Sequence, residues 1–191
     1  MTPLGRELVA MIAQDGPISL ETYMALALGH PRHGYYMARE PFGAAGDFVT
    51  APEISQMFGE LIGLWAAEMW TRMGRPDPVR LVELGPGRGT LMADALRAAR
   101  AMPGFREAIR VELVETSPAL RARQRERLAG SGVSVEWRDR LEDVAPGPAI
   151  VIANEFFDAL PVRHYVRAGD GWRERMVGLD EAGALAFGLA P

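Results

Sequence analysis

The chain has 191 residues, a formal net charge of −4, and neither cysteine nor lysine. Its length fits one domain with a substantial core, and the missing residue types exclude disulfides, thiolate metal sites and Schiff-base lysines. The acidic balance argues against non-specific nucleic-acid binding, and no apolar run reaches the roughly 18 residues that a membrane span needs. We therefore expect a soluble, cytoplasmic, enzyme-like domain.

Two helical segments open the chain, at residues 3–15 and 19–28. A Gly-Pro pair separates them, and Ser19 is a suitable N-cap for the second helix. The loop at 41–50 is rich in glycine and aromatic residues. This composition suits a loop that closes over a flat ligand.

His30 and His33 lie between the second helix and this loop. Two histidines with this spacing suggest a metal pair, but Pro31 stands between them and no third ligand is evident in the sequence. We therefore expect no metal site here. The histidines are interpreted as residues that form hydrogen bonds within the loop.

A long amphipathic helix is predicted to begin in the run Thr50-Ala51-Pro52-Glu53. Thr50 and Glu53 have the spacing of a capping box, in which each side chain binds a backbone N–H of the other residue. Large apolar residues then recur on one face of the helix, and we expect this stripe to lie in the core. Its members are Ile54, Met57, Phe58, Leu61, Trp65 and Met69.

An apolar strand at 80–84 runs directly into the turn Gly85-Pro86-Gly87-Arg88-Gly89, and a helical pattern follows. Glycines let the backbone approach a ligand closely, and the helix behind them offers unpaired N–H groups. The pattern is G-x-G-x-G, and Thr90 stands where a dinucleotide fingerprint has its third glycine. A phosphate-binding P-loop is excluded because it requires a lysine. The turn predicts a site for a nucleotide-type cofactor; a turn without a ligand is the alternative.

The next strand, at 109–115, ends in the carboxylate of Glu115. In a doubly wound sheet this strand lies beside the glycine turn, where a carboxylate can accept hydrogen bonds from both hydroxyls of a ribose. Ser117 then has the N-cap position of a helix that runs to Leu128. Arginines at alternate positions point around this helix, so we interpret them as a solvated surface rather than a nucleic-acid site.

Two further strands are predicted at 133–137 and 149–153. Asp139 and Leu141 follow the first, on the side where the adenine end of such a cofactor would lie. The second is an uninterrupted apolar run, which is typical of a buried parallel strand. The alternation of strands and helices predicts an α/β doubly wound sheet with polar residues at the carboxyl ends of its strands.

Short alternating segments follow Pro161 and predict an antiparallel meander with strands at 162–167, 171–179 and 185–189. We therefore expect three regions in the chain. They are an N-terminal helical region with a lid loop (1–76), a cofactor-binding core (77–161), and the meander as the start of a substrate-side region (162–191).

The segments GDFVTAPEISQMFGE (46–60), ELGPGRG (83–89) and ANEFFDALP (153–161) occur in this order. Together they resemble the MidA family of class I S-adenosylmethionine-dependent methyltransferases, which is related to a mitochondrial complex I assembly factor. The resemblance implies S-adenosyl-L-methionine as methyl donor and, from the mitochondrial relatives, an arginine of a complex I subunit as acceptor. Family members are considerably longer, so it also implies that this chain is truncated at its C-terminal end or that a partner supplies the remaining strands.

The resemblance assigns roles to particular residues. The glycine turn surrounds the amino-acid end of the cofactor, Glu115 binds the ribose, and the loop before Ala51 forms a lid. The cofactor-binding residues implied in this way are Glu83, Gly85, Pro86, Gly87, Gly89, Glu115, Asp139, Leu141, Asn154, Asp47, Phe48 and Thr50. The acceptor nitrogen is expected among Asn154, Glu155 and Asp158, whose carboxylates pair with a guanidinium and help to remove a proton. A turn-capping role is the alternative for Asp158.

We thus expect a methyltransferase that modifies a protein arginine and is linked to complex I assembly, with a homodimer as a further expectation. The alternative is a non-catalytic assembly module that keeps the methyltransferase fold. The intact glycines and Glu115 favour the enzyme. A nucleotide-dependent oxidoreductase is disfavoured by Thr90.

Overall fold

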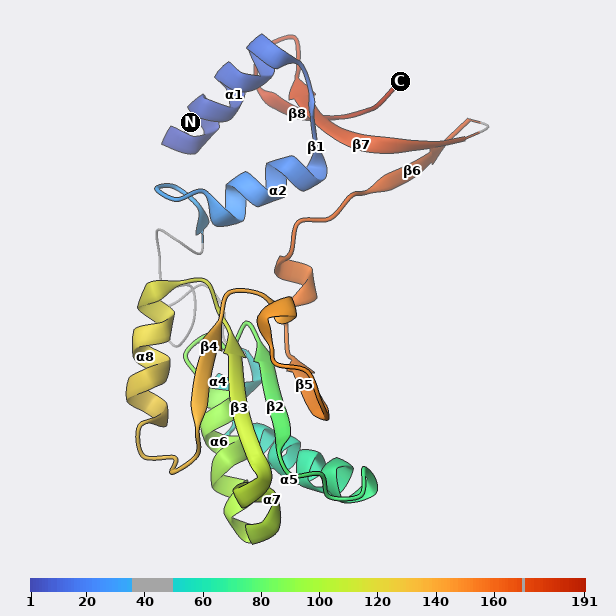
Figure 1. Ribbon diagram of the computed structural model, residues 1–191. Helices are drawn as coiled ribbons and strands as arrows, with labels where there is room; N and C mark the ends of the chain where they lie inside the picture. Colours follow the sequence, from blue (N-terminus) through green and yellow to red (C-terminus); the bar gives the residue numbers. More distant parts are fainter. Residues whose placement is uncertain (36–49, 170) are drawn as a thin grey trace. The chain divides into compact units, whose positions relative to one another are not determined.

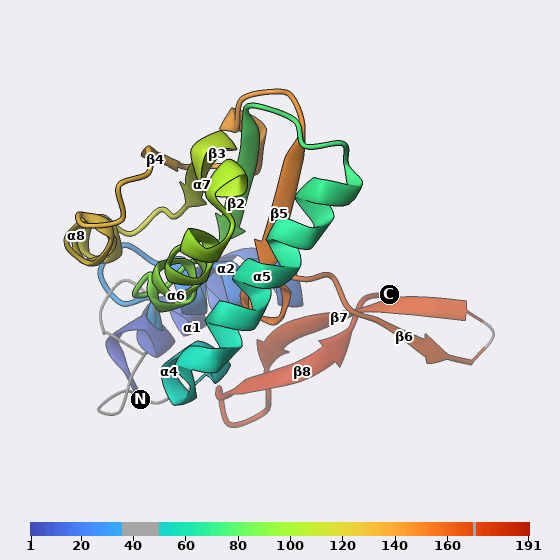
Figure 2. The same cartoon turned by 90° about the horizontal axis from the view of Figure 1, so that it is seen from below.

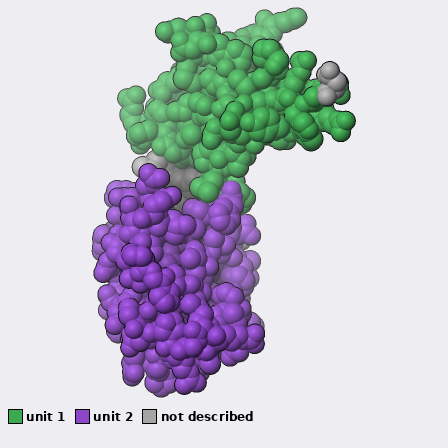
Figure 3. Space-filling view, turned by 45° about the vertical axis from the view of Figure 1, so that its right-hand side comes forward, with its two compact units in different colours: residues 1–41, 158–191 green, residues 42–157 purple. Residues whose placement is uncertain are grey.

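The computed structural model describes residues 1–35, 50–169 and 171–191. The chain divides into two compact units, which Figure 3 shows in separate colours. Unit 1 comprises Met1–Pro41 and Asp158–Pro191, and unit 2 comprises Phe42–Phe157. These units cut across the three regions expected from the sequence. The reason is that Ile18 and Ser19, between the first two helices, pair with a C-terminal strand, while the helix after residue 55 packs in the central α/β unit.

Unit 1 is built from the two ends of the chain (Figure 1). Its elements are α1 (Pro3–Asp15), β1 (Ile18–Ser19), α2 (Leu20–Gly29), β6 (Tyr165–Ala168), β7 (Gly171–Leu179) and β8 (Leu185–Leu189). β1 pairs antiparallel with β7, where Ile18 lies opposite Val177, and β7 also pairs with β6 and β8. The two predicted helices, the Ser19 cap and the meander are confirmed, although β6 begins at Tyr165 rather than at residue 162.

The two histidines of unit 1 form a small polar cluster with Glu7 of α1. The Nε2 atoms of His30 and His33 lie 3.3 and 3.6 Å from the Glu7 carboxylate, and the two rings are stacked. The Nδ1 atom of His30 accepts hydrogen bonds from the backbone N–H groups of Arg32 and His33. This confirms the predicted role in loop hydrogen bonding. In the described part of the chain, no group of three acidic, histidine or cysteine residues is suited to hold a metal ion.

Unit 2 is a parallel sheet with helices packed against it (Figure 1). Its strands are β2 (Val79–Leu84), β3 (Ile109–Val114), β4 (Val135–Arg138) and β5 (Ala149–Ala153), in the order β4-β3-β2-β5. Its α-helices are α4 (Ala51–Ile54), α5 (Gln56–Arg72), α6 (Thr90–Ala98), α7 (Pro103–Ala108) and α8 (Pro118–Leu128). Short 3-10 helices of this unit lie at Ala99–Ala101 and Leu141–Asp143, and another, Phe157–Ala159, spans the point in the sequence where unit 2 ends and unit 1 resumes. The predicted α/β class and the parallel strand alternation are confirmed.

The main core of unit 2 lies on the face of the sheet that carries Leu81, Val111 and Ile150, which are direct neighbours across three strands. Residues of α5, α6 and α8 join this cluster, and Figure 2 shows α5 and α6 along the same side of the sheet. The opposite face carries a smaller cluster of Val82, Leu84 and Val114, against which Val144, Ala153 and Phe156 pack. Because the strands are parallel, their carboxyl ends meet at one edge, where the glycine turn lies.

The helix predicted from residue 51 onward differs from the expectation in two ways. Ser55 has extended backbone and separates α4 from α5, and the Thr50 side chain makes no capping hydrogen bond, so the predicted capping box is wrong. The predicted apolar stripe is also largely exposed rather than buried. Ile54, Met57, Leu61 and Trp65 are exposed, whereas Phe58 and Met69 pack partly against the core.

The small residues of α5 explain this reversal. Gly59, Gly63, Ala66 and Ala67 are buried, and the two glycines lie directly against α6. A Cβ atom on Gly63 would lie 2.5 Å from the backbone oxygen of Ala95, so the two helices meet almost backbone to backbone. The close contact turns the larger side chains of α5 away from the core. No helix within the described ranges is long and apolar enough to cross a membrane.

Candidate functional site

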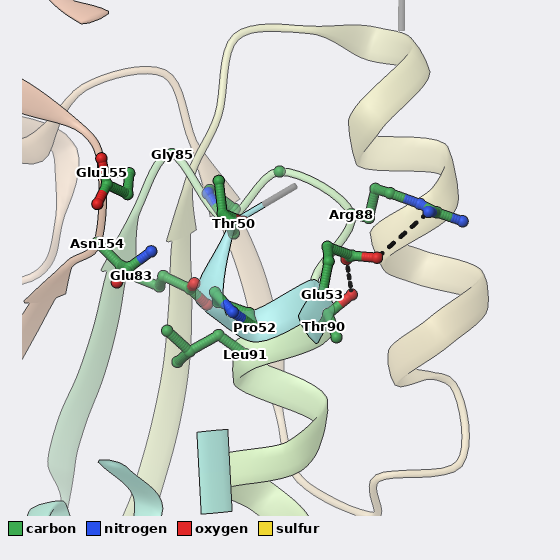
Figure 4. Close-up of a pocket in the computed structure, with 12 residues that line it drawn as sticks. Thr50, Pro52, Glu53, Glu83, Gly85, Arg88, Thr90, Leu91, Asn154 and Glu155 are labelled. Atoms are coloured by element: carbon green, nitrogen blue, oxygen red, sulfur yellow. Dashed lines mark hydrogen bonds and ion pairs between the residues drawn. The ribbon is translucent and has the colours of Figure 1, made fainter. Parts of the chain in front are cut away.

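A pocket lies at the carboxyl edge of the unit 2 sheet (Figure 4). The ends of β2 and β5, the glycine turn, the first turn of α6 and the short helix α4 form its walls. The lining residues are Thr50, Pro52, Glu53, Glu83, Gly85, Pro86, Gly87, Arg88, Thr90, Leu91, Asn154 and Glu155. Seven of these residues were predicted for the site: Thr50, Glu83, Gly85, Pro86, Gly87, Asn154 and Glu155. The pocket lies at the carboxyl edge of the strands, which is where open parallel sheets bind their ligands.

The glycine turn needs glycine at its first and last positions for steric reasons. Gly85 has a φ of 61°, and a Cβ atom there would lie 2.5 Å from the ring of Phe156. Gly89 has a φ of 76° and precedes α6 in a left-handed conformation that other residues rarely adopt. Its missing side chain leaves room for Gln124, whose Cγ atom would be only 3.3 Å from a Cβ. The turn thus presents bare backbone and the N-terminus of α6 to the pocket.

Glu83 is a buried carboxylic acid at the end of β2. Its side chain lines the pocket, and the residue is 3 % exposed. The Oε2 atom has no hydrogen-bond partner among the described residues. Burial raises the pKa of Glu83 to about 8. A buried acceptor without a donor is costly, so this oxygen marks a place where a ligand with N–H groups would be stabilised.

Glu115 follows β3 and is held by its neighbours. Its Oε1 atom accepts a hydrogen bond from the Ser117 backbone N–H at 2.8 Å, and its Oε2 atom accepts one from Gln124 at 3.4 Å. Burial raises the pKa of Glu115, and these hydrogen bonds offset part of that effect. The carboxylate is fixed beside the turn but does not line the pocket described above.

Gln124 is a site residue that the sequence did not reveal. It is fully buried, and its Nε2 atom donates to the carbonyl oxygen of Gly87 at 2.7 Å and to Glu115. Its Oε1 atom accepts from the indole N–H of Trp137 on β4 at 2.8 Å. One amide therefore joins the glycine turn to β4 and to Glu115. A weak signal was present: Gln124 is four residues from both Leu120 and Leu128, on the inward face of α8.

The remaining predicted cofactor residues occupy different places. Asp139 is exposed and forms an ion pair with Arg121 at 2.7 Å, and Leu141 is exposed at the start of a 3-10 helix. Neither residue lines the pocket, so their contact with an adenine stays a prediction. Asp47 and Phe48 lie outside the described residues.

The predicted acceptor residues are divided between the two units. Asn154 and Glu155 line the pocket of unit 2, whereas Asp158 is part of unit 1. Glu155 has a φ of 47°, a left-handed conformation that is unusual for a residue other than glycine. Such backbone strain is often found at functional sites.

Glu53 is the other residue whose place the sequence did not predict. Its carboxylate accepts a hydrogen bond from the Thr90 hydroxyl and forms an ion pair with Arg88 at 3.3 Å (Figure 4). The local spacing of Thr50 and Glu53 suggested a partner within the same helix, whereas the actual partners are more than 30 residues away in the sequence.

A parallel sheet, a glycine turn ahead of a helix and carboxylates at the ends of two strands define a protein of the class that binds nucleotide-type cofactors. The family follows from a family model described as "Putative S-adenosyl-L-methionine-dependent methyltransferase", which matches residues 61–191. The chain belongs to this family. The match confirms the predicted family, and it confirms S-adenosyl-L-methionine as the cofactor of that family.

Curated relatives agree with this assignment. The chain is 41 % identical to "Protein arginine methyltransferase NDUFAF7, mitochondrial" of Danio rerio and 40 % identical to the protein of that name in Homo sapiens. The alignments cover 95 and 100 % of this chain but only 49 % of each relative, so the chain spans about half the length of these relatives. Their names place them in mitochondria, and this finding overturns the cytoplasmic location expected from the sequence.

A solved structure is also similar. It is a COG1565 superfamily member from Burkholderia thailandensis bound to S-adenosyl-homocysteine, with a TM-score of 0.80 and 35 % sequence identity. The comparison covers 98 % of this chain and 49 % of that one. The described residues therefore share their fold with a protein that binds S-adenosyl-homocysteine, the product left when the methyl donor has lost its methyl group.

Proposed function

We propose that this chain binds S-adenosyl-L-methionine at the glycine turn and forms the cofactor-binding half of a methyltransferase that acts on protein arginine. The observation that carries the proposal is the buried oxygen of Glu83, which lacks a partner among the described residues and lies in the pocket beside the turn. The cofactor has an ammonium group, two ribose hydroxyls and a carboxylate. The residues present offer complementary groups for each of these.

The fit follows from the chemistry of the walls. Glu83 would accept hydrogen bonds from the ammonium group, and the bare backbone of the glycine turn would surround the amino-acid end. The N-terminus of α6 would face the cofactor carboxylate. Glu115, oriented by Ser117 and Gln124, would accept hydrogen bonds from the ribose hydroxyls.

When bound, S-adenosylmethionine would supply a methyl group attached to a sulfonium sulfur, and S-adenosyl-homocysteine, a neutral thioether, would be a good leaving group. The main task of the protein is then to align the acceptor, and positioning alone can account for a large part of a rate enhancement. Asn154 and Glu155 line the same pocket, so Glu155 would pair with one edge of a guanidinium and orient one nitrogen towards the donor. It would also accept the proton that this nitrogen loses. Asp158 is the second carboxylate proposed for this role.

The acceptor class rests on the relatives, which are named protein arginine methyltransferases. A subunit of respiratory complex I is the specific acceptor that we propose, on the family resemblance alone. A homodimer is the assembly that we propose to test by mass photometry.

The test is methyl transfer followed by peptide mass spectrometry. The chain is incubated with S-adenosylmethionine and a purified arginine-rich subunit of complex I, and each variant is compared with the wild type. We expect a mass increase of one methyl group on an arginine, and we expect Glu155→Gln and Asp158→Asn to lose the transfer. Methylation of a different residue type, or unchanged transfer by both variants, would contradict the proposed acceptor site.

A further inference from the structure

We propose that Glu53 is a positioning residue for the cofactor, because it fixes the wall formed by α4 to the glycine turn through Thr90 and Arg88. The inference rests on the proposed cofactor binding and goes beyond it, since the role given to Glu53 is to hold a wall of the pocket. It assigns a function to a residue that the sequence suggested was only a local helix cap.

The geometry gives each carboxylate oxygen of Glu53 its own partner. Oε1 accepts from the hydroxyl of Thr90, and Oε2 lies 3.3 Å from the Nη1 atom of Arg88. The carboxylate is well shielded, with a side-chain exposure of 16 %. A charged hydrogen bond in such a place is stronger than one in open solvent. All three residues line the pocket, as Figure 4 shows.

The wall needs such a tether because α4 is only four residues long. A single helical turn is not stable alone, its N-cap Thr50 forms no side-chain cap, and Ser55 interrupts the path into α5. Thr50 and Pro52 nevertheless form part of the pocket. Glu53 supplies the polar contacts that hold this turn against α6.

Thr90 is suited to this role by its position. It is the first residue of α6 and directly follows the left-handed Gly89. A glycine there, as in a dinucleotide fingerprint, would have no hydroxyl to offer Glu53. The threonine that distinguishes this turn from that fingerprint is thus the anchor for a second wall of the pocket.

A similar bridge elsewhere provides a matched control. Glu60 of α5 binds Arg97 of α6 at 3.0 Å, and Arg97 also binds Asp94 at 2.7 Å. This bridge also joins a helix of the 51–72 segment to α6 through a carboxylate and an arginine. None of its three residues lines the pocket.

The test compares five variants by calorimetric titration with S-adenosyl-homocysteine, and urea unfolding is measured for each. We expect Glu53→Gln and Thr90→Val each to weaken binding about 10-fold, the effect of losing one charge-assisted hydrogen bond. Because they break the same contact, the double variant should lose less than the product of the two effects. Thr90→Ser keeps the hydroxyl and should bind within about twofold of the wild type. Glu60→Gln should lower stability but leave the affinity unchanged.

Two results would overturn the proposal. Binding by Glu53→Gln and Thr90→Val at wild-type affinity would show that the tether does not position the site. An equal loss of affinity in Glu60→Gln would show that any weakened helix contact has the same effect. Failure of the proposed function looks different, because the wild-type chain itself would then show no binding.

Discussion

The two sides of the pocket differ in how firmly their side chains are held. On the cofactor side, Gln124 binds the glycine turn and Glu115, and Glu53 binds Arg88 and Thr90. On the proposed acceptor side, the side chains of Asn154 and Glu155 line the pocket and form no hydrogen bond or ion pair with another described residue. The difference teaches that side chains held by hydrogen bonds and side chains without such partners can meet at one sheet edge.

This contrast has a physical consequence. A rigid cofactor side lowers the entropy that binding must overcome, so we expect this chain to bind the cofactor without further polypeptide. An acceptor side with few constraints cannot align a reacting nitrogen well. The chain spans about half the length of its curated relatives, and we expect it to bind the cofactor firmly but to transfer methyl groups slowly.

The largest effect is expected from Gly85→Ala, which acts on the rigid side. The new Cβ would lie 2.5 Å from the Phe156 ring at a positive φ, so the turn must distort. We expect titration calorimetry to show at least about a 100-fold loss of affinity for S-adenosyl-homocysteine, since a distorted turn displaces several ligand contacts together.

Gly74→Ala is the matched control for this change. Gly74 also has a positive φ, of 86°, but a Cβ there would meet no atom within 4 Å. The Gly74→Ala variant should lose about 1 kcal/mol of unfolding free energy, because alanine is strained at positive φ. Its affinity for S-adenosyl-homocysteine should not change. Equal binding losses in the two variants would contradict a specific role for the turn.

A smaller and pH-dependent effect is expected from Glu83→Gln. Burial raises the pKa of Glu83 to about 8 in the folded chain, so between about pH 4.5 and 8 the folded state keeps a proton that the unfolded state loses. The stability contributed by this group is complete below pH 4.5 and is lost as the pH rises through 8. As the pH rises from 4.5 to 8, the unfolding free energy of the wild type should therefore fall relative to that of the variant.

Urea unfolding at several pH values measures this difference. The same variant should bind S-adenosyl-homocysteine more weakly at pH 8, because a neutral amide cannot pair with an ammonium group. A difference in unfolding free energy that stays constant from pH 5 to pH 9 would show that Glu83 does not titrate in this way.

The smallest effect on cofactor binding is expected from Glu155→Gln, on the open side. The side chain is assigned to the acceptor, so the affinity for S-adenosyl-homocysteine should stay within about twofold of the wild type. Calorimetry of the purified variant checks this. A loss as large as that of Gly85→Ala would mean that the two sides of the pocket are not distinct.

The sequence predicted those parts of the fold that depend on local patterns. The apolar run at 149–153 is the parallel strand β5, and Ser117 caps α8 with its hydroxyl. The expectation that this strand is buried was wrong, because β5 lies at the edge of the described sheet and Val151 is exposed. The glycine turn could also be placed, because strand, glycines and helix adjoin in the sequence. Its position beside Glu115 followed from the rule that the carboxyl ends of parallel strands lie at the same edge of the sheet.

The errors arose where a distant neighbour decides the outcome. The period of α5 showed which residues share a face, but Gly63 and Ala95 allow a close helix contact that places the small face inward and leaves Leu61 and Trp65 exposed. Glu53 had the spacing of a capping box, yet Thr90 and Arg88 are stronger partners for its carboxylate. Neither preference can be read from residues a few positions apart.

The most direct test of the account is calorimetric titration of the wild-type chain with S-adenosyl-homocysteine, with NAD as the comparison ligand. We predict saturable binding of S-adenosyl-homocysteine at one site per chain, weakened at least about 100-fold by Gly85→Ala, and no heat of binding with NAD. Absence of binding to S-adenosyl-homocysteine, or equal binding of NAD, would contradict the assignment of this pocket to a methyl donor.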